Sequence, residues 1–168
     1  HYLSIQAKDD SKFFIHNDIG YNYRMTNLHA AIGLAQIERI NQILKKKKKI
    51  SQNYLKCLKK IKNVKLLYKN ESLISKYNCW MNIITINKKN VNIRKLVKFM
   101  ELNSVDVRPI WKLNHLQEKY KKYESFQISK AITLVDKSIC LPSSSSLKLI
   151  DIKKIANLLK NYLKIEKH

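Results

Sequence analysis

The ten residues 18–27, which read DIGYNYRMTN, and the helical stretch after them are the most informative part of this 168-residue chain. Thr26 or Asn27 can cap a helix, because either side chain can accept a hydrogen bond from an amide of the first turn. Apolar and small residues then recur with helical spacing, at Leu28, Ala31, Ile32 and Ala35. The segment predicts an extended or looped approach to a long helix, with a bend, over residues 27 to about 62.

Beyond this helix the sequence alternates between strand and helix patterns. The runs rich in β-branched and bulky residues that predict strands are 64–68, 79–86, 105–108 and 138–141. The helical stripes that separate and follow them lie near residues 93–100, 128–135 and 152–163, and Asn90 or Asn92 can cap the first of these helices. This order predicts an α/β fold class, here a small α+β domain whose sheet packs behind the long helix.

The composition excludes several classes of protein. Hydrophobic residues make up 45% of the chain, which is too much for a disordered protein. No apolar run reaches the roughly 18 to 20 residues that span a bilayer, so no membrane is expected. The three cysteines and five histidines have no metal-ligand spacing, so no metal is expected. We interpret the cysteines as reduced core residues of a cytoplasmic protein.

The formal net charge of +22 raises the possibility of a nucleic-acid-binding domain. Only four of the 34 basic residues are arginines, however, and recognition of bases and phosphates favours the planar guanidinium group. The run Lys45–Lys49 lies on a helical pattern, and we interpret it as a solvated face. A basic domain that binds RNA or an acidic surface stays the alternative from a different functional class.

Two groups of residues together resemble the DegT/DnrJ/StrS sugar-nucleotide aminotransferases, which share the type I fold of aspartate aminotransferase. The first group is 18–36. The second comprises 107–111 (VRPIW), 115–117 (HLQ) and 140–143 (CLPS). The leading 6–10 (QAKDD) and the RPIWK string narrow the resemblance to the LegC and PglE branch, which aminates UDP-linked 4-keto-6-deoxy sugars. The resemblance covers residues 3 to about 160.

The resemblance implies a homodimeric enzyme with shared active sites that uses pyridoxal 5'-phosphate (PLP). Its substrates would be a nucleotide sugar and an amino-acid donor, expected to be glutamate. Residues 1–48 would form the end of the large domain and the start of the connecting helix, and residues 49–168 the small C-terminal domain. The Schiff-base lysine would lie upstream of residue 1, so we expect the isolated chain to be inactive. A PLP-dependent sugar dehydratase of the same fold stays open.

The resemblance also implies five binding residues and no catalytic one. Asn22, on a tight turn permitted by Gly20, matches the family asparagine that reaches the PLP phosphate of the partner subunit, and Arg24 would serve the phosphate or nucleotide. The residues expected at the substrate are Arg108, Trp111 and His115. The structural alternatives are a turn-capping role for Asn22, a surface ion pair for Arg24, a core position for Trp111 and a purely structural role for His115.

Overall fold

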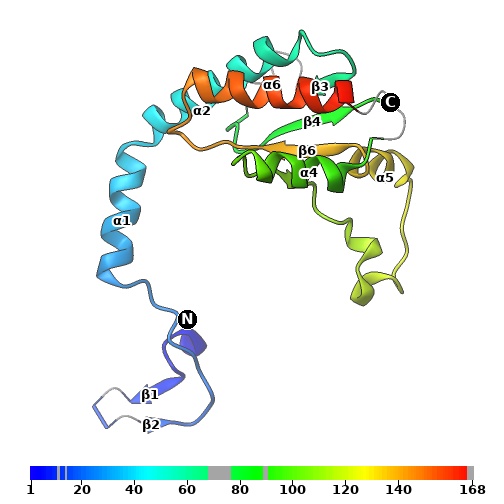
Figure 1. Ribbon diagram of the computed structural model, residues 1–168. Coiled ribbons are helices and arrows are strands. Elements are labelled where there is room, and N and C mark those ends of the chain that lie inside the picture. The colour runs from blue at the N-terminus through cyan, green and yellow to red at the C-terminus, as the bar shows by residue number, and fades with distance from the viewer. Residues whose placement is uncertain (11, 14, 68–76, 89–90, 166–168) are drawn as a thin grey trace. The chain divides into compact units, whose positions relative to one another are not determined.

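The computed structural model describes the chain except residues 11, 14, 68–76, 89–90 and 166–168 (Figure 1). The described residues form two compact units, residues 1–41 and residues 42–168, which we treat separately. The division falls near the start of the second long helix. The assignment of the chain to a large and a small domain stays a prediction.

The first unit combines a small β-structure with one helix. A 3-10 turn, Tyr2–Ser4, precedes the antiparallel strands β1 (Lys8–Asp10) and β2 (Ile15–His16). Helix α1 (Asn27–Glu38) then begins at Thr26, whose side chain accepts a hydrogen bond from the His29 amide at 3.2 Å. The predicted cap is therefore confirmed. No residue of α1 is buried within the described chain, and Leu28 is 70% exposed.

A break at Arg39 separates α1 from α2 (Ile40–Leu58). The Arg39 amide donates to the carbonyls of Gln36 and Ile37, and its ψ of 2° leaves the helical region. This is the predicted bend. Helix α2 ends at Leu58 instead of residue 62, because the chain turns there and Asn63 adopts a left-handed φ of 67°. Asparagine tolerates this conformation better than most residues, so it can close the turn into the next strand.

The second unit contains a four-stranded antiparallel sheet in the order β3-β4-β6-β5. The strands are β3 (Val64–Leu66), β4 (Asn82–Ile86), β5 (Arg108–Pro109) and β6 (Ser138–Leu141). The strand predicted at 138–141 is confirmed, and the end of the one predicted at 64–68 lies outside the described residues. Strand β4 starts at Asn82 instead of residue 79, because Cys79 has a φ of 53°, which is incompatible with a strand.

Strand β5 is also displaced from its predicted span of 105–108. Val105 and Val107 are buried, but only Arg108 and Pro109 pair with β6. Alternating apolar residues resemble a strand in sequence, although here both valines are buried because they pack into the hydrophobic core. A proline is acceptable at this position because β5 is an edge strand.

Three long helices share one hydrophobic core with the sheet (Figure 1). These are α2, α4 (Ile93–Leu102) and α6 (Leu149–Ile165); a shorter helix, α5 (Ser129–Val135), precedes β6. Asn92 caps α4 by accepting a hydrogen bond from the Lys95 amide at 3.0 Å, as predicted. The core joins Tyr54 and Leu58 to Leu96, Ile139 and Leu159. Burying each such side chain contributes about 1.5–3 kcal/mol.

None of the helices in the described part of the chain is long and apolar enough to span a bilayer.

Candidate functional site

Asn22 lies in an extended segment of the first unit. It forms an isolated antiparallel bridge with Ile5, and the amides on either side of it donate to the carbonyls of Leu3, at 2.7 Å, and Ser4, at 3.0 Å. The expectation that Asn22 sits on a tight turn is therefore wrong. The backbone pairing fixes the direction of this segment, and the Asn22 side chain is exposed beside it.

Gly20 has a different role from the predicted one. Its φ is not positive, so it does not serve a left-handed turn. A Cβ added there would lie 2.2 Å from the Ala7 nitrogen and 2.4 Å from the Gln6 carbonyl carbon. Glycine is required at this position because the 6–7 backbone passes too close for any side chain.

The chemistry of Asn22 and Arg24 suits a phosphate ligand. Both side chains are exposed, and neither makes a hydrogen bond or an ion pair with another residue that the structure describes. Their amide and guanidinium donors are therefore not used by other described residues, and charge-assisted hydrogen bonds to phosphate oxygens are among the stronger ones in proteins. The two residues therefore fit the phosphate of PLP, and their roles stay predictions.

Arg108 carries an oriented positive charge on the second unit. Its Nε donates to Asp106 Oδ1 at 2.9 Å and its Nη2 donates to Asp106 Oδ2 at 3.1 Å. The hydrogen bond with Asp106, followed by its charge, raises the pKa of Arg108 above the ordinary value. Both side chains are mostly exposed to solvent. Asp106 therefore holds the guanidinium on one edge and leaves Nη1 available to a ligand.

Trp111 is a surface residue, so the alternative of a core tryptophan is wrong. Its side chain is 61% exposed, and its ring lies against that of Trp80, with the centroids 6.1 Å apart and the planes tilted by 38°. Sequence reasoning treated Trp80 as part of the strand 79–86 and missed this contact. The available signal was that Trp80 and Trp111 are the two tryptophans of the chain.

His115 lies in a 3-10 turn, Asn114–Leu116, and is half-buried. Its Nε2 is buried and has no hydrogen-bond partner among the residues that the structure describes. A cavity of about 410 Å³ opens beside it, lined also by Tyr120, Tyr123, Glu124 and Phe126. A buried ring nitrogen normally has a hydrogen-bond partner, so the environment of Nε2 is unusual, and the role of His115 at the substrate stays a prediction.

A polar cluster around Ser143 joins three elements of the second unit. The Ser143 hydroxyl donates to the Cys79 carbonyl at 3.2 Å and lies 3.4 Å from the buried Asn82 amide nitrogen. The Lys47 amine donates to the Ser143 carbonyl at 2.5 Å. Lys47 is therefore half-buried and bonded, although Lys45, Lys46 and Lys49 are exposed. The interpretation of the whole lysine run as a solvated face is wrong for Lys47.

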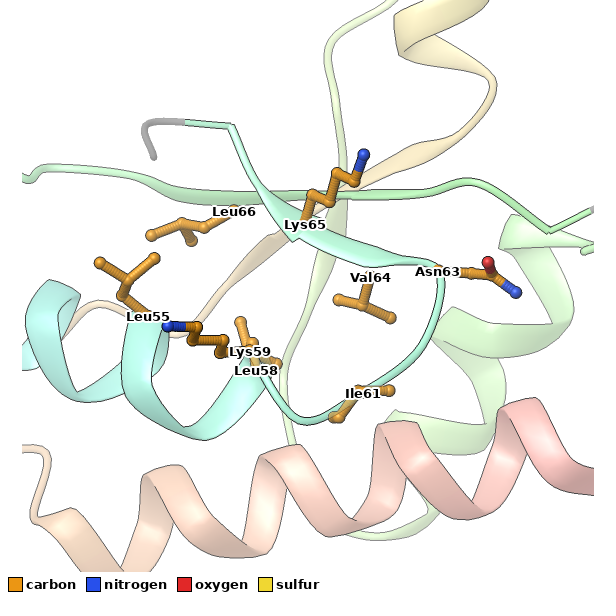
Figure 2. Close-up of a pocket in the computed structure, with 8 residues that line it drawn as sticks. All are labelled: Leu55, Leu58, Lys59, Ile61, Asn63, Val64, Lys65 and Leu66. Carbon is orange, nitrogen blue, oxygen red and sulfur yellow. The ribbon is translucent and has the colours of Figure 1, made fainter. Parts of the chain in front are cut away.

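A second cavity, of about 440 Å³, lies between the end of α2 and β3 (Figure 2). Leu55, Leu58, Val64 and Leu66 supply its apolar lining, and Lys65 projects away from it. It contains none of the five predicted binding residues. The described residues also hold no cluster of three or more histidine, cysteine, aspartate or glutamate side chains that could bind a metal ion.

The five predicted residues thus divide between the two units. Asn22 and Arg24 belong to the first, and Arg108, Trp111 and His115 belong to the second. Within the second unit the structure places the Trp80 ring against that of Trp111 and the Asp106 carboxylate beside the Arg108 guanidinium.

Comparisons with known proteins agree on one family. The sequence profile of the DegT/DnrJ/EryC1/StrS aminotransferase family matches residues 1–160. The chain is 32% identical over 164 residues to a GDP-perosamine synthase of Vibrio cholerae, covering 95% of this chain and 43% of that protein. It is 26% identical over 150 residues to EpsN of Bacillus subtilis strain 168, provisionally named a pyridoxal phosphate-dependent aminotransferase, covering 87% of this chain and 38% of that protein.

A solved structure shows the same fold. Helicobacter pylori PseC, an aminotransferase involved in pseudoaminic acid biosynthesis, superposes with a TM-score of 0.79 at 18% identity, covering 97% of this chain and 45% of that one. The expected fold class, an α/β portion of the type I PLP-transferase fold, is confirmed. The chain spans less than half the length of each of these three relatives.

Proposed function

Because this chain belongs to the DegT/DnrJ/EryC1/StrS aminotransferase family, we propose that the protein containing it transfers an amino group to the keto carbon of a nucleotide-linked 4-keto-6-deoxy sugar. The family match over residues 1–160 is the observation that carries this proposal. Glutamate would be the amino donor and would leave as its oxo acid. The active protein would be a homodimer with shared sites.

Two nucleotides are candidates for the substrate. The motif strings at 6–10 and 108–112 resemble the branch that acts on UDP-linked sugars, so UDP is our first proposal. A GDP-linked sugar is the second, favoured by the relative from Vibrio cholerae that is named a GDP-perosamine synthase. The aminotransferase reaction is the same in both cases.

The first unit would contribute to the cofactor site. When bound, PLP carries the amino group from donor to acceptor and supplies the electron sink that this transfer requires. Asn22 would donate its side-chain amide to the cofactor phosphate across the dimer, and Arg24 would offset the phosphate charge. The backbone bridge between Asn22 and Ile5 supports this role, because it holds the segment without using the side chain.

The second unit would contribute to the sugar-nucleotide site. Arg108, oriented by Asp106, would bind the diphosphate through its remaining donors. Trp111 would pack against the ligand, and His115, which lines a cavity, would lie near the sugar. A positive, partly apolar surface of this kind suits a ligand with a charged diphosphate and a deoxygenated hexose.

The test is a direct assay of the full-length protein. The purified protein is incubated with PLP, glutamate and a 4-keto-6-deoxyhexose linked to either UDP or GDP. Formation of the amino sugar is followed by mass spectrometry, and formation of 2-oxoglutarate by a coupled reaction. Amino-sugar formation from one nucleotide series supports the proposal and selects the nucleotide; turnover of neither series would refute it.

A further inference from the structure

Trp80 and Trp111 form an exposed aromatic pair on the second unit. Their side chains are 59% and 61% exposed, although their rings contact each other. Tryptophan is highly buried in most folded proteins, because its large ring gains most from leaving water. Two adjacent exposed tryptophans therefore indicate a surface that another molecule covers.

The backbone beside Trp80 is held firmly even though its ring is exposed. The Trp80 amide donates to Asn78 Oδ1 at 3.0 Å, and the preceding Cys79 has a left-handed φ of 53°. Ser143 fixes this unusual conformation by donating its hydroxyl hydrogen to the Cys79 carbonyl at 3.2 Å. Conformations of this kind persist where the surroundings over-determine them, and they concentrate at ligand-binding sites.

Asn82 and Lys47 in turn support Ser143. Asn82, which is 1% exposed, places its amide nitrogen 3.4 Å from the Ser143 hydroxyl, and the Lys47 amine donates to the Ser143 carbonyl at 2.5 Å. Side chains from two separate elements, β4 and α2, therefore converge on the residue that holds the Cys79–Trp80 backbone. A backbone held in this way needs little further ordering when a ligand binds beside it, which favours affinity.

Arg108 lies on the edge strand of the sheet, close in sequence to Trp111. Arg108 pairs with Cys140, and Cys140 pairs with Ile83, so these three residues share one face. Trp80 lies three residues before Ile83, and Trp111 lies three residues after Arg108. The core-forming residues Ile84 and Ile139 occupy the opposite face. The Arg108 guanidinium, a cation suited to a diphosphate, thus lies on the face of the sheet opposite Ile84 and Ile139, three residues along the chain from Trp111.

We propose that Trp80 and Trp111 together form the contact surface for the hexose of the nucleotide sugar, with Trp80 as a specificity-determining residue. This inference rests on the proposed function. A flat base would stack parallel to a single ring, but two rings tilted by 38° cannot both lie parallel to it. A puckered hexose carries C–H groups on both faces and can contact both tilted rings. Its deoxygenated C6 methyl group adds apolar surface to that contact.

The first test uses kinetics of the full-length protein with three variants. Trp80→Ala should raise the KM for the keto sugar about tenfold and leave kcat within about twofold, because ground-state and transition-state binding are lost together. Trp80→Phe should keep most of the affinity, since a flat apolar ring remains. Leu102→Ala is the matched control, because Leu102 is 77% exposed at the end of α4 and belongs to no proposed site.

The second test identifies which part of the ligand the pair contacts. The full-length protein is labelled with 5-fluorotryptophan, and the Trp80 and Trp111 resonances are assigned by their loss in Trp80→Phe and Trp111→Phe. The nucleotide-sugar product should shift both resonances, whereas the matching nucleoside diphosphate alone should shift neither. An equal shift with the nucleoside diphosphate alone would place the base there and overturn the hexose assignment.

The outcomes separate the two proposals. If the parent protein aminates no nucleotide sugar, the proposed function fails and this inference falls with it. If the parent is active and Trp80→Ala keeps the KM of Leu102→Ala, this inference alone is overturned. A folded Trp80→Ala variant, judged by circular dichroism, with a raised KM that Trp80→Phe restores supports it.

Discussion

Removal of the Ser143 hydroxyl should destabilise the second unit measurably. In Ser143→Ala the Cys79 carbonyl loses its donor and the buried Asn82 amide loses a nearby acceptor, while the Lys47 bond to the Ser143 carbonyl is retained. The Asn82 oxygen already has no partner among the residues that the structure describes, so this buried amide would be left largely unsatisfied. Each lost hydrogen bond contributes about 0.5–1.5 kcal/mol net, and an unsatisfied buried group costs about 1–3 kcal/mol.

Two features of the geometry place the expected loss in the lower part of the summed range. Ser143 is half-buried, so water can replace part of what is removed, and the 3.4 Å separation from Asn82 is long for a strong bond. We expect the free energy of unfolding to fall by about 2 kcal/mol. For a chain of this size that corresponds to a lowering of Tm by roughly 4–8 °C.

Urea denaturation of the chain, followed by circular dichroism and by tryptophan fluorescence, measures this change. Ser144→Ala is the matched control, because its hydroxyl is exposed and bonds only with neighbouring Ser146 in the described chain. It should change the unfolding free energy by less than about 0.5 kcal/mol. A loss in Ser143→Ala no larger than that of Ser144→Ala would refute the reasoning that this cluster holds the Cys79–Trp80 segment.

Three further predictions follow from other parts of the chain. Asn22→Ala in the full-length dimer should weaken PLP retention roughly ten- to a hundredfold, since a hydrogen bond to a charged acceptor is worth about 1.5–3 kcal/mol. A PLP titration with unchanged affinity would show that the role implied for Asn22 by the family resemblance is wrong. Replacing the exposed Lys45, Lys46 and Lys49 with glutamine should leave PLP affinity unchanged in the same titration. If the parent protein instead binds nucleic acid in a salt-dependent way and these replacements abolish that binding, the alternative of a basic nucleic-acid-binding domain is favoured. Burial raises the pKa of Tyr54 above its ordinary value of 10.0, so the unfolded state loses this proton at lower pH than the folded state. The free energy of unfolding should therefore fall as pH rises above 10, by at most about 1.4 kcal/mol per pH unit. Tyr54→Phe should flatten that fall in a series of urea denaturations at pH 9 to 11.

Local sequence signals predicted the features that depend on neighbouring residues. The caps at Thr26 and Asn92 are confirmed, because a capping side chain bonds to an amide three residues away and needs no distant partner. The bend between α1 and α2 and the strand at 138–141 were also predicted. The family was identified from motif strings within the sequence, and the profile match over residues 1–160 confirms it.

Features that depend on distant residues were not predictable in this way. Gly20 appears suited to a turn in sequence, but only the approach of the 6–7 backbone explains why it must be glycine. The sequence predicts a strand that begins at Cys79, but the bond from Ser143, 64 residues away, holds that residue in a left-handed conformation. Lys47 is indistinguishable from its neighbours in a lysine run until Ser143 is placed beside it.

The sequence alone therefore determined the family, the order of helices and strands, and the residue types available to bind phosphate. Those properties follow from short-range periodicity, capping and motif strings. The tertiary structure decided that Trp80 meets Trp111, that Asp106 orients Arg108 and that a buried cluster holds Cys79 and Trp80 in place. The physical reason is that packing contacts join residues far apart in the chain, so they exist only after the backbone has brought those residues together.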